Sequence, residues 1–295
     1  MKIIQSLWSK PGKARIKGNH AIANACGWRD KKYNYFSWTL SCLQFKKYYP
    51  EVELVTDKEG YELLINRLKL PYTDVRVELD ELEHYPPELW AIGKIYTYGI
   101  QDKPFIHADG DVIIWERFRH DLENSPLLCQ SREEGFPFSE IYVVTFSSIL
   151  QNFSYYPELL IKSIDRNNGI LAINAGIIGG NDIPFFKDYV TQAFDFVDRN
   201  LKDLHKIDAD KFNVIFEQFL FRALAEERQA PISFFHPTAT IFDDYAGVPD
   251  KTKFIHTPGN KKQDTYFVNC LEYRLLSDYP DYYYKIIELL KANEI

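Results

Sequence analysis

Two aspartates separated by one glycine, Asp109-Gly110-Asp111, are the residues of this chain best suited to chemistry. An apolar run, 105–108, precedes them, and a second apolar run, 112–114, follows them. This pattern predicts a buried strand that delivers both carboxylates to its carboxyl end. Because two close carboxylates repel each other, the pair favours a divalent metal ion that is itself bound to substrate phosphates.

The spacing alone is weak evidence, because the same pattern recurs at Asp208-Ala209-Asp210 without a strand before it. The alternative interpretation of the first pair is a solvated turn with a helix cap. A calcium-binding EF-hand is excluded, because the order Asp-x-Asp-x-Asp-Gly is missing.

A histidine and a lysine near the end of the chain are candidates for the same site. His256 lies where a short apolar segment enters a turn, and a neutral imidazole there would complete the ligands of a metal ion. Lys262 is a candidate for neutralising phosphate charge. The structural alternatives are a core histidine and a surface lysine beside Lys261.

Two further motifs interrupt apolar stretches. Asn174-Ala175-Gly176 breaks the apolar run 173–180, and glycine inside a strand lets a ligand or another backbone approach closely. Glu217-Gln218 lies in an otherwise apolar helical stretch and faces either a cleft or solvent.

The first 115 residues alternate strands and helices. We expect strands at 2–8, 52–56, 75–77 and 105–108, helices at 30–49, 61–68 and 86–101, and a loop after the first strand with a short helix at 21–25. Such alternation predicts a parallel sheet with helices on both faces, and ligands of such sheets bind beyond the carboxyl ends of the strands. Trp8 and Asp57 also fall at strand ends, so we expect them to join the aspartates in one crevice.

The rest of the chain continues with both kinds of element. We expect strands at 127–130, 173–180, 232–235 and 253–256, and helices at 157–165, 184–204, 210–227 and 266–292, the last one broken near Pro280. Residues 139–153 allow no clear assignment. Neither G-x-G-x-x-G nor a Walker-type loop occurs, which argues against dinucleotide and P-loop enzymes.

Composition narrows the class of protein. The 295 residues suit one large domain or two small ones, and 45% hydrophobic with 26% charged residues is typical of a soluble globular protein. A net charge of -7 argues against nucleic-acid binding. The four scattered cysteines favour reduced thiols in the cytoplasm, and the sequence has neither a membrane span nor a signal peptide.

Taken in order, these motifs resemble the nucleotide-sugar glycosyltransferases of the GT-A fold, the family of glycogenin and the bacterial lipopolysaccharide galactosyl- and glucosyltransferases. The resemblance implies a Rossmann-like α/β fold whose mostly parallel sheet is flanked by helices. It divides the chain into a nucleotide-binding half, 1–115, a donor-sugar and acceptor half, 116–262, and a helical C-terminal extension, 263–295. The family's usual Asp-Asp after the first strand is replaced here by residues 5–8, and its catalytic aspartate by Glu217.

The resemblance also implies roles for individual residues. Mn²⁺ or Mg²⁺ would be held by Asp109, Asp111 and His256. The catalytic pair would be Glu217 and Gln218. The substrate-binding residues that it implies would be Asn174, Ala175, Gly176, Gly259 and Lys262. From their places in the chain we add Trp8 and Asp57, which fall at strand ends, and Lys94, on the helix before the metal strand.

The expected activity is transfer of a hexose from a UDP-sugar to a glycan or glycolipid acceptor, with retained configuration, in bacterial surface polysaccharide synthesis. Any membrane contact would be peripheral. Two alternatives stay open: a metal-dependent nucleotidyltransferase or phosphohydrolase, and a non-catalytic nucleotide-sugar-binding domain. The sugar, the acceptor, the aromatic residue that stacks on the base and the oligomeric state are undetermined by the sequence. An inverting reaction, with Glu217 as its general base, also stays open.

Overall fold

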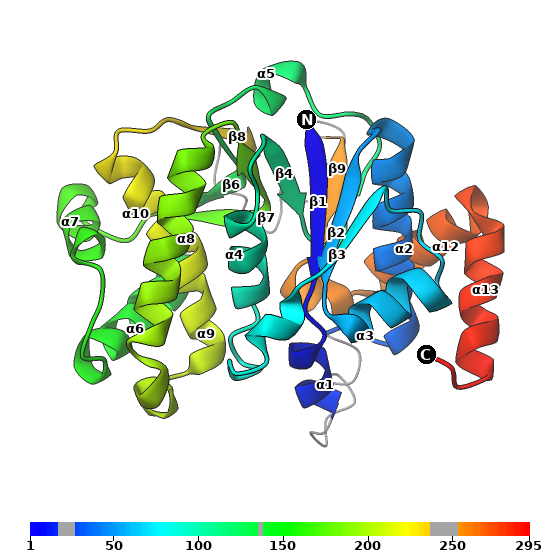
Figure 1. Ribbon diagram of the computed structural model, residues 1–295, viewed down its shortest axis with the longest axis horizontal. Helices are drawn as coiled ribbons and strands as arrows, with labels where there is room; N and C mark the ends of the chain where they lie inside the picture. Colours follow the sequence, from blue (N-terminus) through cyan, green and yellow to red (C-terminus); the bar gives the residue numbers. More distant parts are fainter. Residues whose placement is uncertain (17–26, 135–137, 237–252) are drawn as a thin grey trace. The chain divides into compact units, whose positions relative to one another are not determined.

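The structure is a computed structural model that describes residues 1–16, 27–134, 138–236 and 253–295 (Figure 1). It is an α/β protein with a seven-stranded, mixed and mostly parallel sheet flanked by helices, as expected from the alternating pattern. The chain forms two compact units, which we call the terminal unit (2–87, 108–117 and 253–295) and the central unit (88–107 and 118–252). Both are discontinuous in sequence, whereas the predicted functional halves were continuous; that division stays a prediction.

The terminal unit contains three parallel strands in the order β3-β2-β1 and a two-stranded antiparallel ribbon, β5 with β9. Its strands are β1 (Lys2–Leu7), β2 (Val52–Thr56), β3 (Asp74–Val77), β5 (Val112–Ile114) and β9 (Phe254–His256). Its helical segments are α1 (Lys10–Ile16), α2 (Lys31–Tyr48), α3 (Lys58–Tyr61), η2 (Glu62–Arg67), η3 (Leu79–Leu82), η7 (Gly259–Gln263), α12 (Thr265–Asp278) and α13 (Pro280–Lys291).

Helix α2 organises the terminal unit. Asp30 caps its first turn by accepting a hydrogen bond from the Lys32 amide, and the chain leaves the helix before Pro50, as predicted. One side of α2 packs against β5 and β2, and α12 and α13 pack on it as well. Its aromatic residues therefore enter a shared core, in which the Phe36 ring stacks on Tyr283 of α13.

The central unit has the strand order β4-β7-β6-β8, in which β6 is antiparallel to β7 and parallel to β8. Its strands are β4 (Phe105–Ala108, whose last residue counts with the terminal unit), β6 (Leu127–Glu133), β7 (Ala172–Gly180) and β8 (Ile232–His236). Its helical segments are α4 (Ile92–Gly99), α5 (His120–Glu123), α6 (Phe138–Asn152), α7 (Glu158–Asn167), α8 (Ile183–Asp198), η4 (Leu201–Lys206), α9 (Ala209–Val214), η5 (Ile215–Phe219) and α10 (Leu220–Glu227).

Close backbone approach explains the paired glycines that end β7. A Cβ on Gly179 would overlap the Phe105 carbonyl of β4, and one on Gly180 would overlap the Pro126 carbonyl. The prediction that glycine here admits another backbone is therefore confirmed at these two positions.

Two local predictions are wrong. The segment after β1 is not all loop, because α1 begins at Lys10 and accommodates Pro11 in its first turn, where proline is tolerated. Helix α4 begins at Ile92 instead of residue 86; the preceding Ala91 amide is bound by the Asn213 side chain, 2.9 Å away, which no local pattern reveals. The helix expected over 210–227 is confirmed as one continuous helical stretch, in which a π-helical turn, η5, separates α9 from α10.

Other predictions hold. The C-terminal residues are helical and break at Pro280. Residues 139–152, which allowed no clear assignment from the sequence, lie in α6. The short helix expected at 21–25 lies outside the described residues.

Candidate metal centre

The Asp-Gly-Asp motif forms a tight turn between β4 and β5. The Val112 amide donates to the Asp109 carbonyl over 3.0 Å, which closes a four-residue turn. Gly110 is required by crowding, because a Cβ there would overlap the indole of Trp38 on α2. The turn therefore presents two carboxylates that are two positions apart, as the sequence predicts.

Strand pairing brings the histidine to this turn. In the antiparallel ribbon, Val112 of β5 lies opposite His256 of β9. The next residue of β9's chain, Thr257, donates both its amide (3.2 Å) and its hydroxyl (3.1 Å) to the Asp111 carbonyl. The register therefore places His256 beside Asp111, although 145 positions separate the two residues in the sequence.

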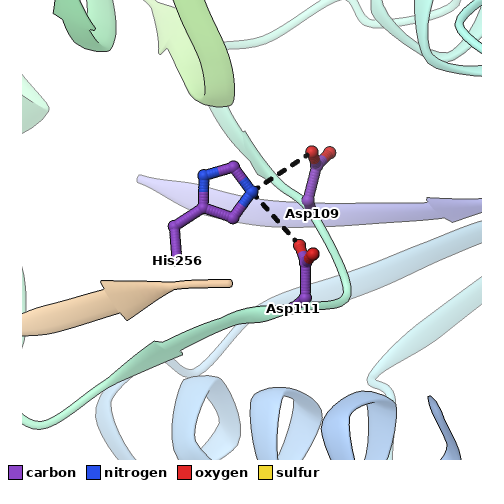
Figure 2. Close-up of side chains that lie close together, drawn as sticks. All are labelled: Asp109, Asp111 and His256. Carbon is purple, nitrogen blue, oxygen red and sulfur yellow. Dashed lines mark ion pairs between the residues drawn. The ribbon is translucent and has the colours of Figure 1, made fainter. Parts of the chain in front are cut away.

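Asp109, Asp111 and His256 point toward one another (Figure 2). The His256 Nε2 atom lies 3.3 Å from Asp111 Oδ1 and 3.9 Å from Asp109 Oδ2, and one ligand atom of each residue lies within 4.8 Å of the others. Neighbouring ligands around an octahedral ion with bonds of roughly 2.1 Å are about 3 Å apart, and opposite ones about 4 Å apart. The spacing, with two oxygen donors and one nitrogen donor, therefore fits a divalent cation such as Mn²⁺ or Mg²⁺.

The charge balance of the cluster depends on Lys262. Its Nζ atom lies 2.9 Å from Asp111 Oδ2. Burial by itself would raise the pKa of Asp111, but the Lys262 charge and His256 together hold this pKa well below its usual range. The carboxylate is thus ionised at neutral pH and ready to bind a cation.

Two tryptophans flank the cluster. Trp38 packs on Gly110, as described above, and the ammonium group of Lys262 lies 5.4 Å from the centre of the buried Trp28 ring. Gly259, also predicted to bind substrate, has a left-handed backbone with φ of 54° and starts η7, the short helix that carries Lys262.

The other two predicted residues of this unit are buried at strand ends. Asp57 caps α3 by accepting the Gly60 amide (2.7 Å) and also accepts the Ser9 amide (2.6 Å), so the ends of β1 and β2 meet as expected. Trp8 is 7% exposed. Substrate contacts by Trp8 and Asp57 stay predictions.

In the central unit, Lys94, Ala175 and Glu217 come together. The Lys94 ammonium group lies 2.6 Å from the Glu217 carboxylate and donates to the Ala175 carbonyl over 3.1 Å. The Glu217 side chain is fully buried, and the Tyr189 hydroxyl donates to its backbone carbonyl. In this structure Glu217 therefore neutralises Lys94, and a catalytic role for it stays a prediction.

Asn174 and Gln218 converge on Glu133, a residue that the sequence analysis missed. Asn174 donates to one Glu133 oxygen over 2.8 Å, and Tyr142 donates a short hydrogen bond to the other. With its amide nitrogen turned toward the carboxylate, Gln218 also donates to Glu133, over 3.2 Å. The Asn174 oxygen accepts the Gly176 amide. The antiparallel pairing of β6 with β7, which was not predicted, is what brings Glu133 to Asn174.

Comparison with known families places almost the whole chain in one group. Residues 1–289 match DUF6734, a family of unknown function. The chain belongs to this family. No curated protein shows significant similarity to it. Membership in DUF6734 assigns no chemistry, so the function must be inferred from the residues themselves.

Within the described ranges, no helix is both long and apolar enough to cross a bilayer.

Proposed function

We propose that this protein is a metal-dependent glycosyltransferase of the GT-A fold that moves a hexose from a UDP-sugar to a glycan or glycolipid acceptor. The observation that carries the proposal is the convergence of Asp109, Asp111 and His256 beside Lys262, on an α/β scaffold. These are the side chains, in the same chain order, on which the resemblance to the glycosyltransferases rests.

The residues of the terminal unit would act on the diphosphate. Asp109, Asp111 and His256 would hold Mn²⁺ or Mg²⁺, and the bound cation would supply positive charge that stabilises the leaving UDP. Lys262 would move its charge from Asp111 to a phosphate oxygen, which its flexible side chain permits. Trp8 or one of the tyrosines would stack on the base.

The residues of the central unit would act on the sugar. Asn174 and Gln218 are partly exposed and carry amide groups suited to sugar hydroxyls. Glu133 holds both amides in place, whereas the buried Lys94–Glu217 pair supports the backbone of Ala175. We therefore propose Gln218 as the residue of the Glu217-Gln218 pair that faces the sugar, with retention of the anomeric configuration.

The alternative of a two-metal phosphohydrolase needs more carboxylates than this cluster offers. Asp109, Asp111 and His256 form the one group of three metal-binding side chains found in the described part of the chain. This group offers ligands for one cation, which is what the proposed transferase requires. A cytoplasmic location and a role in bacterial surface polysaccharide synthesis belong to the same proposal.

The test is calorimetric titration with UDP in the presence and absence of Mn²⁺, followed by a panel of UDP-sugars. We expect UDP to bind tightly only with Mn²⁺, and slow release of UDP from one of the sugars. Asp111→Asn should abolish both. NMR of the glycoside formed on an acceptor would report the anomeric configuration. Unchanged Mn²⁺ dependence in Asp111→Asn would overturn the metal assignment, and binding without turnover would favour a non-catalytic domain.

A further inference from the structure

In the terminal unit, the four consecutive backbone carbonyls of residues 109–112 all accept hydrogen bonds from side chains. The Asp111 carbonyl accepts from Thr257, as described above. Ser37 donates its hydroxyl to the Gly110 carbonyl over 2.9 Å, and Ser41 donates to the Val112 carbonyl over 2.5 Å. The Gln5 amide donates to the Asp109 carbonyl over 3.4 Å.

Apart from Thr257, the donors are side chains of two elements, α2 and β1. Ser37 and Ser41 are four residues apart and therefore share one face of α2, the face that meets β5. Gln5 lies in the buried middle of β1 and also donates to the Ser41 hydroxyl over 2.9 Å. All three side chains are at most 1% exposed.

The Gln5 amide is itself held in one orientation. The hydroxyl of Tyr72 donates to its oxygen over 2.8 Å, which turns the amide nitrogen toward Ser41 and Asp109. Buried polar groups destabilise a fold unless they are hydrogen-bonded. Each of these three buried side chains makes such a hydrogen bond. Their common partner is the turn that carries Asp109 and Asp111.

A short ribbon such as β5 with β9 is only marginally stable by itself. Without fixed carbonyls, the turn would sample other backbone conformations, and the two carboxylates would separate. A cation would then lose binding energy in reordering them.

We propose that Gln5, Ser37 and Ser41 are positioning residues for the metal site: they fix the backbone of the 109–112 turn so that both carboxylates face the cation. They touch the turn and not the ion. The inference needs the metal site, but it does not need the transferase reaction of the proposed function.

The test measures the Mn²⁺ affinity of the full chain by calorimetry. Ser37→Ala and Ser41→Ala should each weaken Mn²⁺ binding about tenfold, the size typical of lost support around metal ligands. The double variant should lose about a hundredfold. Ser37→Thr, which keeps the hydroxyl, should retain most of the affinity.

Two control variants separate positioning from general stability. Thr39 is fully buried on the same helix, and its hydroxyl makes no hydrogen bond within the described part of the chain, so Thr39→Val should leave Mn²⁺ affinity unchanged. Ser163, buried in the central unit, donates to Glu226 over 2.7 Å; Ser163→Ala should lower the melting temperature in EDTA as much as Ser37→Ala does, without changing affinity.

The outcomes are distinct. Affinities of Ser37→Ala and Ser41→Ala within twofold of the parent would overturn the inference, and so would equal losses in the control variants. If Ser41→Ala fails to fold, Ser37→Ala and Ser37→Thr decide. A parent protein that binds no Mn²⁺ would overturn both the inference and the metal site. A parent that binds Mn²⁺ but turns over no UDP-sugar would overturn only the proposed function.

Discussion

The ammonium group of Lys262 lies 2.9 Å from the carboxylate of Asp111, inside the cluster that would bind the cation. Lysine and metal ion thus compete for the same negative charge. Lys262→Met should therefore raise Mn²⁺ affinity in the absence of nucleotide, by about tenfold, since one removed contact between opposite charges is worth roughly 1–2 kcal/mol at a partly exposed position. It should lower UDP affinity at saturating Mn²⁺, because the diphosphate loses a partner.

Both quantities are measured by calorimetry. Lys211→Met is the control, because Lys211 forms a similar pair with Asp208 (3.2 Å) in the exposed part of the central unit and should change neither affinity. A drop in Mn²⁺ affinity on removal of Lys262 would contradict the competition.

The contact between Gly110 and Trp38 predicts a second result. Gly110→Ala should destabilise the protein by about 1–3 kcal/mol and weaken Mn²⁺ binding, because the new methyl group must displace the indole or the turn. Chemical denaturation measures the first effect and calorimetry the second. In a Trp38→Leu background the same change should cost less, because the smaller side chain leaves room. If Gly110→Ala lowers the free energy of unfolding equally in both backgrounds, the effect comes from the backbone of residue 110 and not from crowding.

The buried pair of Lys94 and Glu217 predicts strong coupling. Glu217→Gln or Lys94→Met should each destabilise the protein by about 3–5 kcal/mol, because each leaves an uncompensated buried charge. The double variant should be more stable than either single one. Urea denaturation of the four proteins gives the coupling free energy. If the two single changes in the free energy of unfolding add up to that of the double variant, the pair does not act as a structural unit. That result would favour a catalytic role for Glu217.

Lys261, beside Lys262, predicts a pH effect on stability. Burial lowers the pKa of its ammonium group from 10.5 to about 7, although Asp264 acts in the opposite direction. Between these two values the unfolded chain holds the proton and the folded chain does not, so stability rises with pH from about 7 to 10. Below pH 7 the folded protein bears the full penalty of a buried charge.

Lys261→Met should remove this penalty. We expect the variant to be more stable than the parent at pH 6, and the difference to shrink steadily up to pH 10. Urea denaturation in EDTA at four pH values measures the free energy of unfolding of both proteins. In the difference between them, the contributions of titrating groups that both proteins share cancel. A difference that is constant with pH would show that Lys261 is charged in the folded state throughout.

Local sequence patterns predicted much of the fold and the residues of the candidate metal centre. The apolar run before Asp109 marks a strand end, Asp30 and Pro50 bracket α2, and Pro280 divides the last two helices. Each of these signals lies within a few residues of the feature that it determines. For that reason the sequence could name Asp109, Asp111 and His256 without any contact being known.

Only the tertiary structure decided which of these residues meet. The register of β5 with β9 places His256 at the aspartate turn, the pairing of β6 with β7 brings Glu133 to Asn174, and packing alone joins Lys94 to Glu217. In the sequence, Gln5, Ser37 and Ser41 look like ordinary polar residues of a strand and a helix. Their partners are the carbonyls of a turn about 70 to 100 positions away, and such pairings depend on how elements pack together, which no local periodicity encodes.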